Sequence, residues 1–375
     1  MARINKVLIV GGGIAGLTLA IGLTQQGIEV DLVEIKTEWT VYGVGIIQQA
    51  NVLRAMEHLG LLDTYVATGF PFDEVGMYGP DGGLRVKLPS PRLAGNRYPA
   101  NMGISRRALH DMLTHTAQEK GTRVRLGITV HSFEEGPDHI EVTFTDGTQG
   151  QYDLVVGADG LYSKVRTLLF GDIKPTFSGM SVWRHNFQRP AHVDHLMAYP
   201  STPHTNAAGI VPLGKDLMYL FVTSREDGNP WMPQEKLHQL MQERMQGLGG
   251  LVGELAREIT DPQQVVYKPI EVVFQDGPWH KGRVLLIGDA VHATSPHVGQ
   301  GAGMAIEDSA VLSEMLPGSH HLEDTLQDFT RRRFERCRTI HQMSMQVNTW
   351  ELTHPPDANT PGIIQQMMQY TAQPI

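Results

Sequence analysis

A glycine-rich turn near the N-terminus is the part of the chain that points most directly to a chemistry. An apolar run at residues 6–10 leads into Gly11, Gly13 and Gly16 in the spacing G-x-G-x-x-G, and a helical pattern follows. In such a turn the first glycine permits the tight bend, the second lets the backbone approach a pyrophosphate, and the third allows helix and strand to pack closely. Glu34 ends the next apolar run, where a carboxylate accepts hydrogen bonds from the hydroxyls of an adenosine ribose. We therefore expect a dinucleotide-binding fold.

Two further segments place polar residues at the end of a buried strand. Asp159 and Gly160 follow one apolar run, and Gly288 and Asp289 follow another. Each pair alone is ambiguous, because aspartate and glycine also make ordinary turns. After the second pair, a glycine-rich loop that begins at Pro296 opens a helix, whose N-terminal amides can stabilise negative charge.

In this order along the chain, the three segments resemble the fingerprints of the class A flavoprotein aromatic hydroxylases, the single-component FAD monooxygenases of the salicylate, para-hydroxybenzoate and 6-hydroxynicotinate hydroxylase type. The resemblance extends from residue 5 to about residue 350. It implies an FAD cofactor, NADPH or NADH as a transient reductant, and O2 as a co-substrate. It also implies that a small aromatic or heteroaromatic ring attacks a flavin C4a-hydroperoxide, from which water must be excluded.

The resemblance also implies which residues bind FAD. Arg106 would contact a flavin phosphate, for which a guanidinium is well suited. Asp159 would lie near the FAD pyrophosphate and the NAD(P)H, Asp289 would bind a ribityl hydroxyl, and Pro296 with residues 299–303 would lie beneath the isoalloxazine. The expected FAD-binding residues are Gly11, Gly13, Ala15, Gly16, Glu34, Gly45, Arg106, Asp159, Gly160, Asp289, Pro296, Gly299, Gly301, Ala302 and Gly303.

Three residues are candidates for substrate binding and catalysis. His297 directly follows Pro296, and an imidazole there would take the proton from a phenol or hydroxypyridine, although a buried structural histidine would look the same. Arg184 and Tyr219 lie in alternating, strand-like segments and are the other candidates. Their alternatives are a solvated strand residue and a packed aromatic. Ile47 stands where some pyridine hydroxylases carry a polar side chain beside their substrate. This difference argues against assigning the same substrate to this chain.

The strand and helix signals predict an α/β fold: a Rossmann-like FAD-binding domain, an inserted antiparallel β-sheet and a long C-terminal helix. Residues 1–171 and 281–375 are expected to form the discontinuous FAD-binding domain. Residues 172–280 are expected to form the substrate domain, with part of 71–100 contributing. The final twenty residues are expected to be loosely ordered. Helices are predicted at about 51–60, 106–120, 234–245, 299–316 and 322–352.

Composition excludes several other classes of protein. The 375 residues include 31 basic and 40 acidic side chains, a net charge of −9, so electrostatic binding to nucleic acid is not expected. No apolar run is long enough to span a membrane, and the single cysteine, Cys337, suits a reducing compartment, so we expect a cytoplasmic protein. Cys337 lies far from the glycine-rich turn, so we expect non-covalent FAD. The scattered histidines predict no metal site.

Other functions stay open at this point. A flavin-dependent reductase or dehydrogenase of the same fold needs no oxygen insertion, and a non-catalytic flavin-binding protein needs no substrate. A plain NAD dehydrogenase has no use for Gly288-Asp289. The identity of the ring, the hydroxylated carbon, the choice between NADH and NADPH, and the choice between monomer and homodimer are likewise open.

Overall fold

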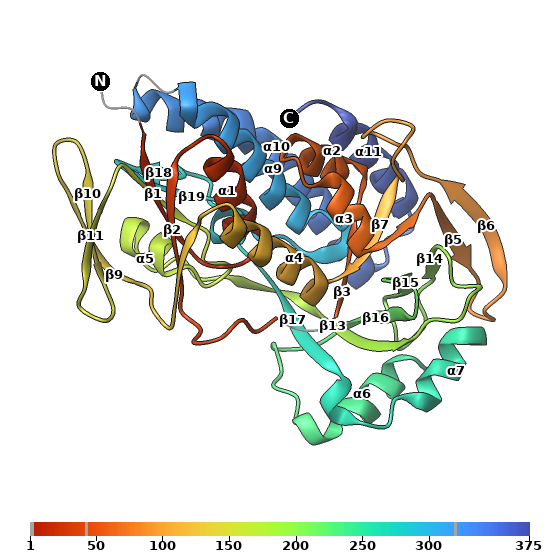
Figure 1. The fold of residues 1–375 in the computed structure, drawn as a ribbon. Helices are drawn as coiled ribbons and strands as arrows, with labels where there is room; N and C mark the ends of the chain where they lie inside the picture. Colours follow the sequence, from red (N-terminus) through yellow and green to blue (C-terminus); the bar gives the residue numbers. More distant parts are fainter. Residues whose placement is uncertain (1–3, 42–43, 319–320) are drawn as a thin grey trace.

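The computed structural model describes residues 4–41, 44–318 and 321–375. Its N-terminal part is built on a six-stranded sheet, in which the glycine-rich turn follows a central strand (Figure 1). All neighbours in this sheet are parallel except β18 and β19. In spatial order the strands are β18 (His280–Lys281), β19 (Val284–Leu286), β12 (Leu154–Gly157), β1 (Lys6–Val10), β2 (Glu29–Glu34) and β8 (Arg123–Leu126).

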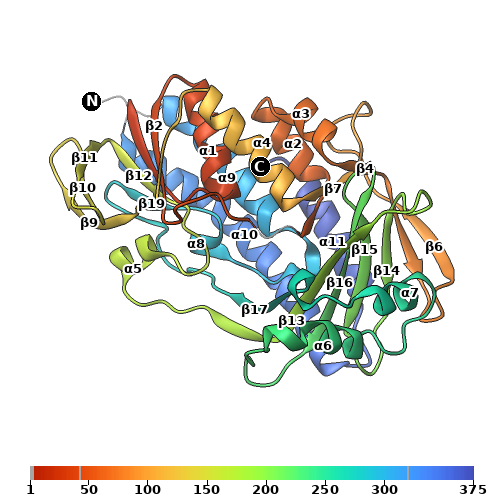
Figure 2. The ribbon, with the colours of Figure 1, turned by 60° about the horizontal axis from the view of Figure 1, so that its bottom comes forward.

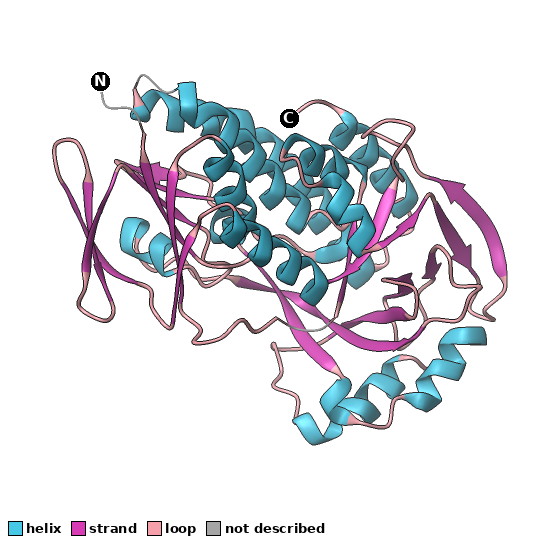
Figure 3. Ribbon diagram, viewed as in Figure 1, coloured by secondary structure: helices cyan, strands magenta, loops and turns pink. Residues whose placement is uncertain are grey.

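Helices gather beside this sheet, while a small antiparallel sheet extends away from it (Figure 3). The first helix is buried along most of its length, because it packs against both the sheet and a second apolar helix, α9. The helices here are α1 (Ile14–Gln25), α2 (Ala50–His58), α3 (Leu62–Thr68), α4 (Arg106–Glu119), α5 (Lys164–Phe170), α8 (Asp289–His292) and α9 (Gly301–Met315). The small sheet contains β9 (Val130–Glu135), β10 (Ile140–Phe144) and β11 (Gln149–Tyr152).

A seven-stranded sheet forms the other part of the molecule, beside α6 and α7 (Figure 2). Its neighbours are antiparallel except for β14 and β5. In spatial order the strands are β17 (Val266–Val272), β13 (Thr176–Gln188), β16 (Leu217–Arg225), β15 (Ala207–Pro212), β14 (Leu196–Tyr199), β5 (Glu74–Tyr78) and β6 (Leu84–Pro89). The helical elements of this part are η1 (Gln234–Lys236), α6 (Leu237–Arg244), α7 (Gly250–Glu258) and η2 (Pro262–Gln264).

The two faces of the seven-stranded sheet have different partners. Because side chains alternate along a strand, Trp183 and Leu220 point to one face, where they join a core with residues of α6 and α7. The next residue of β13, Arg184, and the residue before Leu220 in β16, Tyr219, point to the opposite face. The register of this sheet therefore brings Arg184 and Tyr219 to the same side.

The C-terminal part confirms one prediction and corrects another. The long helix α10 (Leu322–Thr353) follows η4 (Leu316–Gly318) and crosses from α9 to β13. The expectation that the final twenty residues are loosely ordered is wrong, because α11 (Thr360–Ala372) is a docked helix. Asn359 caps its first turn, and Met367 is fully buried. A third sheet, which the sequence did not predict, contains β3 (Gly45–Gln48), β7 (Asn101–Ser105) and β4 (Phe70–Phe72).

The predicted fold class is confirmed: a parallel, Rossmann-like α/β part, a largely antiparallel inserted sheet and a long helix near the C-terminus. Among the described residues, no helix combines the length and the apolar character needed to cross a membrane.

Candidate active site

A cavity of about 680 Å³ opens at the carboxyl ends of the parallel strands and reaches the seven-stranded sheet. Its volume lies within the range usual for ligand and cofactor sites, and the carboxyl edge of a parallel sheet is where such folds bind nucleotides. Most of the residues predicted from the sequence line this cavity. They are Gly11, Gly13, Ala15, Glu34, Gly45, Arg106, Asp159, Gly160, Asp289, Pro296, Gly299, Gly301 and Ala302, together with Arg184 and Tyr219.

The three positions of the first turn are glycine for different structural reasons. Gly11 has φ +110°, and a methyl group added to it would lie 2.4 Å from the carbonyl oxygen of Ala158. A methyl group on Gly16 would lie 2.0 Å from the carbonyl oxygen of Gly11, so this glycine serves helix packing and does not line the cavity. At Gly13 the added methyl group meets no atom within 4 Å. Only at Gly13 does the missing side chain leave space for a ligand.

His110 and Trp39, which the sequence analysis did not identify, support this turn together with Glu34. The Glu34 carboxylate accepts the Gly12 N–H at 2.8 Å, and the Gly12 carbonyl lies 2.8 Å from the His110 ring nitrogen Nε2. The ring of Trp39 packs edge-on against His110 and lines the cavity, at a centroid distance of 5.0 Å. His110 lies one helical turn after Arg106 on α4, so the i, i+4 spacing could have indicated a shared face.

The Asp159 loop is held in place mainly by its own hydrogen bonds. The Asp159 carboxylate accepts the Ser163 hydroxyl and, at 3.0 Å, the Val165 N–H, at the start of α5. Burial raises the pKa of Asp159 despite these bonds. Arg166 is buried and donates to the Ala290 carbonyl at 2.7 Å, which ties this loop to α8. The loop therefore presents backbone groups of a fixed conformation to the cavity.

Asp289 presents a free carboxylate to the cavity. It is the first residue of α8 and is exposed, and within the described parts of the chain no hydrogen bond to its side chain is found. The preceding Gly288 has φ +60°, and its N–H donates to the Asp308 carboxylate at 2.9 Å. A methyl group on Gly288 would lie 3.0 Å from the Ala15 side chain. Backbone conformation and close packing both require this glycine.

The seven-stranded sheet contributes one cation and one phenol. Burial, and to a smaller extent the nearby Arg106, lower the pKa of Arg184 to about 10. Burial raises the pKa of Tyr219, whereas the two arginines oppose this shift. Near neutral pH the cavity therefore holds two guanidinium groups beside a protonated phenol. The Tyr219 ring packs onto Gly45, where a methyl group would lie 2.3 Å from a ring carbon.

The loop from Pro296 to Gly303 divides into lining and supporting residues. Pro296 and Gly299 line the cavity, and Gly299 has φ +67°. The structure does not place His297 in the lining: its side chain is 2% exposed, and its Nε2 lies 3.5 Å from the Glu351 carboxylate. Gly303 is also outside the lining, because it packs against Gln300. Of the three substrate candidates, Arg184 and Tyr219 are thus brought together and His297 lies behind the loop.

These residues fit FAD. Glu34 suits the adenosine ribose, the open space at Gly13 suits a pyrophosphate, and the Arg106 guanidinium suits a phosphate. The unpartnered Asp289 carboxylate suits a polyol chain. The start of α9, at Gly301, directs backbone N–H groups towards the cavity, where they can stabilise negative charge on a ring.

Comparison with known proteins identifies the family of the chain and its cofactor. The chain belongs to the family described as FAD binding domain, which matches residues 5–342. The resemblance inferred from the three motifs is thereby confirmed, and FAD is the cofactor of this protein.

Several known proteins are similar to this chain over almost their whole length. A putative FAD-dependent monooxygenase, YetM, of Bacillus subtilis is 30% identical over 94% of this chain and 96% of its own. The 2-heptyl-3-hydroxy-4(1H)-quinolone synthase of Pseudomonas aeruginosa is 32% identical over 92% of this chain and 90% of its own. The structure of Klebsiella pneumoniae HpxO with FAD and uric acid superposes with a TM-score of 0.87 at 23% identity, covering 98% and 96% of the two chains, and supports the fold.

Proposed function

We propose that this protein is an FAD-dependent monooxygenase that uses NAD(P)H and O2 to hydroxylate a small, electron-rich aromatic or heteroaromatic ring. The observation that carries the proposal is the single cavity in which the FAD-binding residues meet Arg184 and Tyr219. Bound FAD, once reduced by NAD(P)H, supplies the chemistry that activates O2 for transfer to the ring. A cytoplasmic location, and a monomeric or homodimeric state, belong to the same proposal.

Arg184 favours the reactive form of the substrate. A guanidinium stabilises an ionised ring hydroxyl or ring carbonyl oxygen, and therefore lowers the pKa of a phenol-like substrate. Ionisation raises the electron density at the ring carbon that is hydroxylated. The second guanidinium, Arg106, strengthens the positive potential in the same cavity. The relatives include an enzyme named for a hydroxy-4-quinolone product, which is a ring of this electronic type.

Tyr219 orients the ring and helps to exclude water. Its raised pKa keeps the phenol protonated, so the hydroxyl can donate a hydrogen bond to a ring oxygen. Its ring lines the cavity, and the ring of Phe221 lies 6.0 Å away on the same side of β16, which makes the surroundings of Tyr219 apolar. Apolar surroundings limit loss of the activated oxygen to hydrogen peroxide.

His297 is proposed as a base only if its imidazole, which lies behind the flavin loop 3.5 Å from the Glu351 carboxylate, turns towards the cavity when substrate binds. Tyr219→Phe and His297→Ala separate the two roles. If His297 accepts the substrate proton, His297→Ala lowers product per NAD(P)H and raises hydrogen peroxide more than Tyr219→Phe does. An unaltered product-to-peroxide ratio in His297→Ala, with a lowered ratio in Tyr219→Phe, would assign ring activation to the cavity residues alone.

The decisive experiment tests whether an oxygen atom of O2 enters the product. The purified yellow protein is screened with hydroxybenzoates, aminobenzoates, hydroxypyridines and 4-quinolones for stimulated oxidation of NADH and NADPH. For each active compound, the product is analysed after reaction under 18O2. Product that carries one 18O atom supports the proposal. Oxidation of NAD(P)H with an unlabelled product supports the reductase alternative, and the absence of any stimulation across the panel supports a non-catalytic flavoprotein.

A further inference from the structure

A buried polar network ties the flavin loop to the N-terminal part of the chain. The side-chain amides of Asn51 and Gln300 bond to each other in both directions, at 3.0 Å each. Asn51 also donates to the Glu307 carboxylate at 2.9 Å. Gln49 donates to the Val298 carbonyl at 3.0 Å. The loop that lines the cavity is thus held from behind by α2 and α9.

The same network reaches the C-terminal helix. Arg336 of α10 donates two hydrogen bonds of 2.8 Å to Glu307, and a further one of 3.0 Å to the Thr371 carbonyl at the end of α11. Arg54 of α2 donates to the carbonyls of Thr371 and Ala372, at 3.0 and 2.8 Å. Two guanidinium groups therefore bind the C-terminal end of α11, where helix carbonyls lack intrahelical partners.

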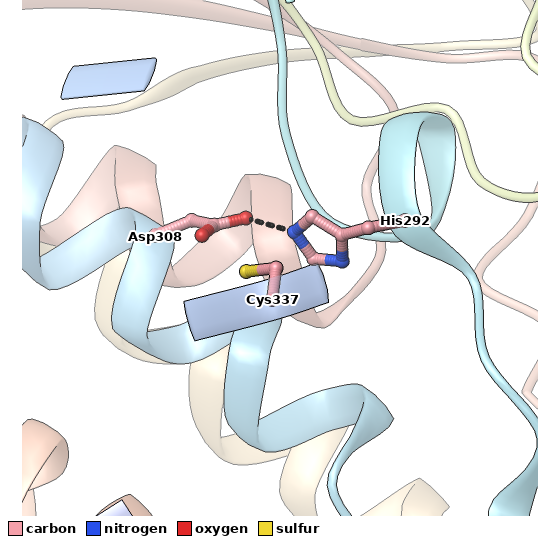
Figure 4. A group of neighbouring side chains, drawn as sticks. All are labelled: His292, Asp308 and Cys337. Atoms are coloured by element: carbon pink, nitrogen blue, oxygen red, sulfur yellow. Dashed lines mark hydrogen bonds and ion pairs between the residues drawn. The ribbon is translucent and has the colours of Figure 1, made fainter. Parts of the chain in front are cut away.

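A second branch fixes the turn that carries Asp289. Asp308 accepts the Gly288 N–H at 2.9 Å and Arg333 Nε at 2.8 Å, and its other contact is His292 Nε2 at 2.7 Å (Figure 4). Cys337 lies beside this pair, but Arg333 donates to Asp308 and lies 3.6 Å from the Cys337 sulfur. His292, Asp308 and Cys337 could together bind a metal ion. Because the positive guanidinium of Arg333 contacts two of these three side chains, an ion-paired core is favoured over a metal site.

We infer that Glu307 and Asp308 are positioning residues for the flavin, and that α11 is the far anchor of this arrangement. The two neighbouring carboxylates of α9 are both fully buried. One holds the loop under the ring through Asn51 and Gln300, and the other holds the Asp289 turn. Buried carboxylates keep a single geometry only when every partner is in place, so Arg336 transmits the docking of α11 to Glu307. Arg333 pairs with both Glu307 and Asp308 and extends this coupling to the Asp289 turn. The inference rests on FAD binding and does not require the proposed hydroxylation.

The test disrupts the polar network at two places, near the flavin loop and at α11. Asn51→Leu keeps the volume and deletes the amide, and a chain that ends at residue 358 deletes α11. Gln242→Leu in α6 is the control, because it removes partly buried hydrogen bonds to the Ala256 and Ile259 carbonyls in another part of the molecule. Hydrogen exchange of residues 296–301 in the apoprotein, FAD affinity and the FAD absorption spectrum are measured for each.

We expect faster exchange in the loop, about tenfold weaker FAD binding and a shifted flavin absorption band in Asn51→Leu and in the shortened chain. Gln242→Leu should leave all three as in the wild type at an equal loss of thermal stability. Asn51→Gln should restore part of the affinity, because its amide can still donate to Glu307. An Asn51→Leu protein with unchanged exchange, affinity and spectrum overturns the inference, as does a control that changes to the same extent. If the shortened chain does not fold, Asn51→Leu decides the role of Glu307. Arg54→Met, which removes the hydrogen bonds to the Thr371 and Ala372 carbonyls, then decides the role of α11 by the same three measurements.

Discussion

The two main sheets contribute to the cavity in different ways. The parallel sheet supplies backbone turns. Gly11 and Gly288 adopt positive φ there, and a methyl group added to either glycine would lie 3.0 Å or less from a neighbouring atom. The seven-stranded sheet supplies side chains, Arg184 and Tyr219, from neighbouring strands. We expect the parallel region to bind the cofactor and the seven-stranded sheet to define which substrate reacts. Substitutions in the two regions should therefore have separable effects.

The largest effect is expected at Gly13. The first side-chain carbon of a valine there would meet no protein atom within 4 Å, so Gly13→Val should abolish FAD binding and leave the apoprotein folded. FAD content after purification and the melting temperature of the apoprotein measure the two consequences. Gly16→Val is the matched control, because its side chain meets the Gly11 carbonyl and should destabilise the fold itself. Full FAD content in Gly13→Val would make the turn a packing motif only.

The next largest effect is expected at Asp289. Its carboxylate is free of protein partners among the described residues and faces the cavity, so Asp289→Ala removes a charged hydrogen bond to the cofactor. Such a bond contributes about 1.5–3 kcal/mol, or about one to two decades of FAD affinity. Titration of the apoprotein with FAD measures it. An unchanged affinity would remove Asp289 from the cofactor site.

Arg184 tests the other side of the comparison. Arg184→Gln should keep FAD affinity within about twofold, yet lower kcat/KM for the hydroxylated ring about 10- to 100-fold, because one charged contact is lost. Arg189→Gln is the control: this arginine follows β13 and donates to the Gly214 and Lys215 carbonyls, outside the cavity lining. A loss of FAD in Arg184→Gln with normal turnover by the remaining holoenzyme would move Arg184 from the substrate side to the cofactor side.

The smallest effect concerns stability in acid. Burial alone would raise the pKa of Glu307, but Arg333 and Arg336 outweigh it and lower this pKa. A carboxyl group with a lowered folded pKa stabilises the protein above its unfolded pKa of about 4.3, and this stability is lost as the pH falls through the folded value. Glu307→Gln should therefore flatten the decrease in unfolding free energy below about pH 4.5, by up to 1.4 kcal/mol per pH unit. Urea unfolding between pH 7 and pH 3 measures the slope, and an unchanged slope contradicts the pairing.

Much of the parallel region could be predicted because its requirements are local. Gly11, Gly13 and Gly16 are close in sequence, so their spacing alone suggested their roles. Gly16 packs against the Gly11 carbonyl, whereas Gly13 leaves open space in the cavity. Glu34 was placed by the end of a strand. His110, in contrast, reaches the Gly12 carbonyl across the fold, and only its distance of one helical turn from Arg106 hinted at this.

The seven-stranded sheet could be predicted as a sheet but not as a site. Arg184 and Tyr219 lie together because Arg184 pairs with Phe221, and Asn186 with Tyr219, and that register is set by non-local pairing. His297 was selected because it adjoins Pro296, yet a neighbouring residue in a turn can point the opposite way. The helix α11 was missed because its docking depends on Arg54 and Arg336, far away in the sequence.

The first two strands of the seven-stranded sheet, in chain order, have a consequence for engineering. β5 and β6 come from residues 74–89, before the chain has completed the parallel sheet, whereas the other five strands come from residues 176–272. The chain thus passes between the two halves several times, and an isolated segment of residues 172–280 would expose the edge of β14. We expect cooperative unfolding in one transition. A chimera that exchanges substrate specificity with a relative must transplant both stretches at once.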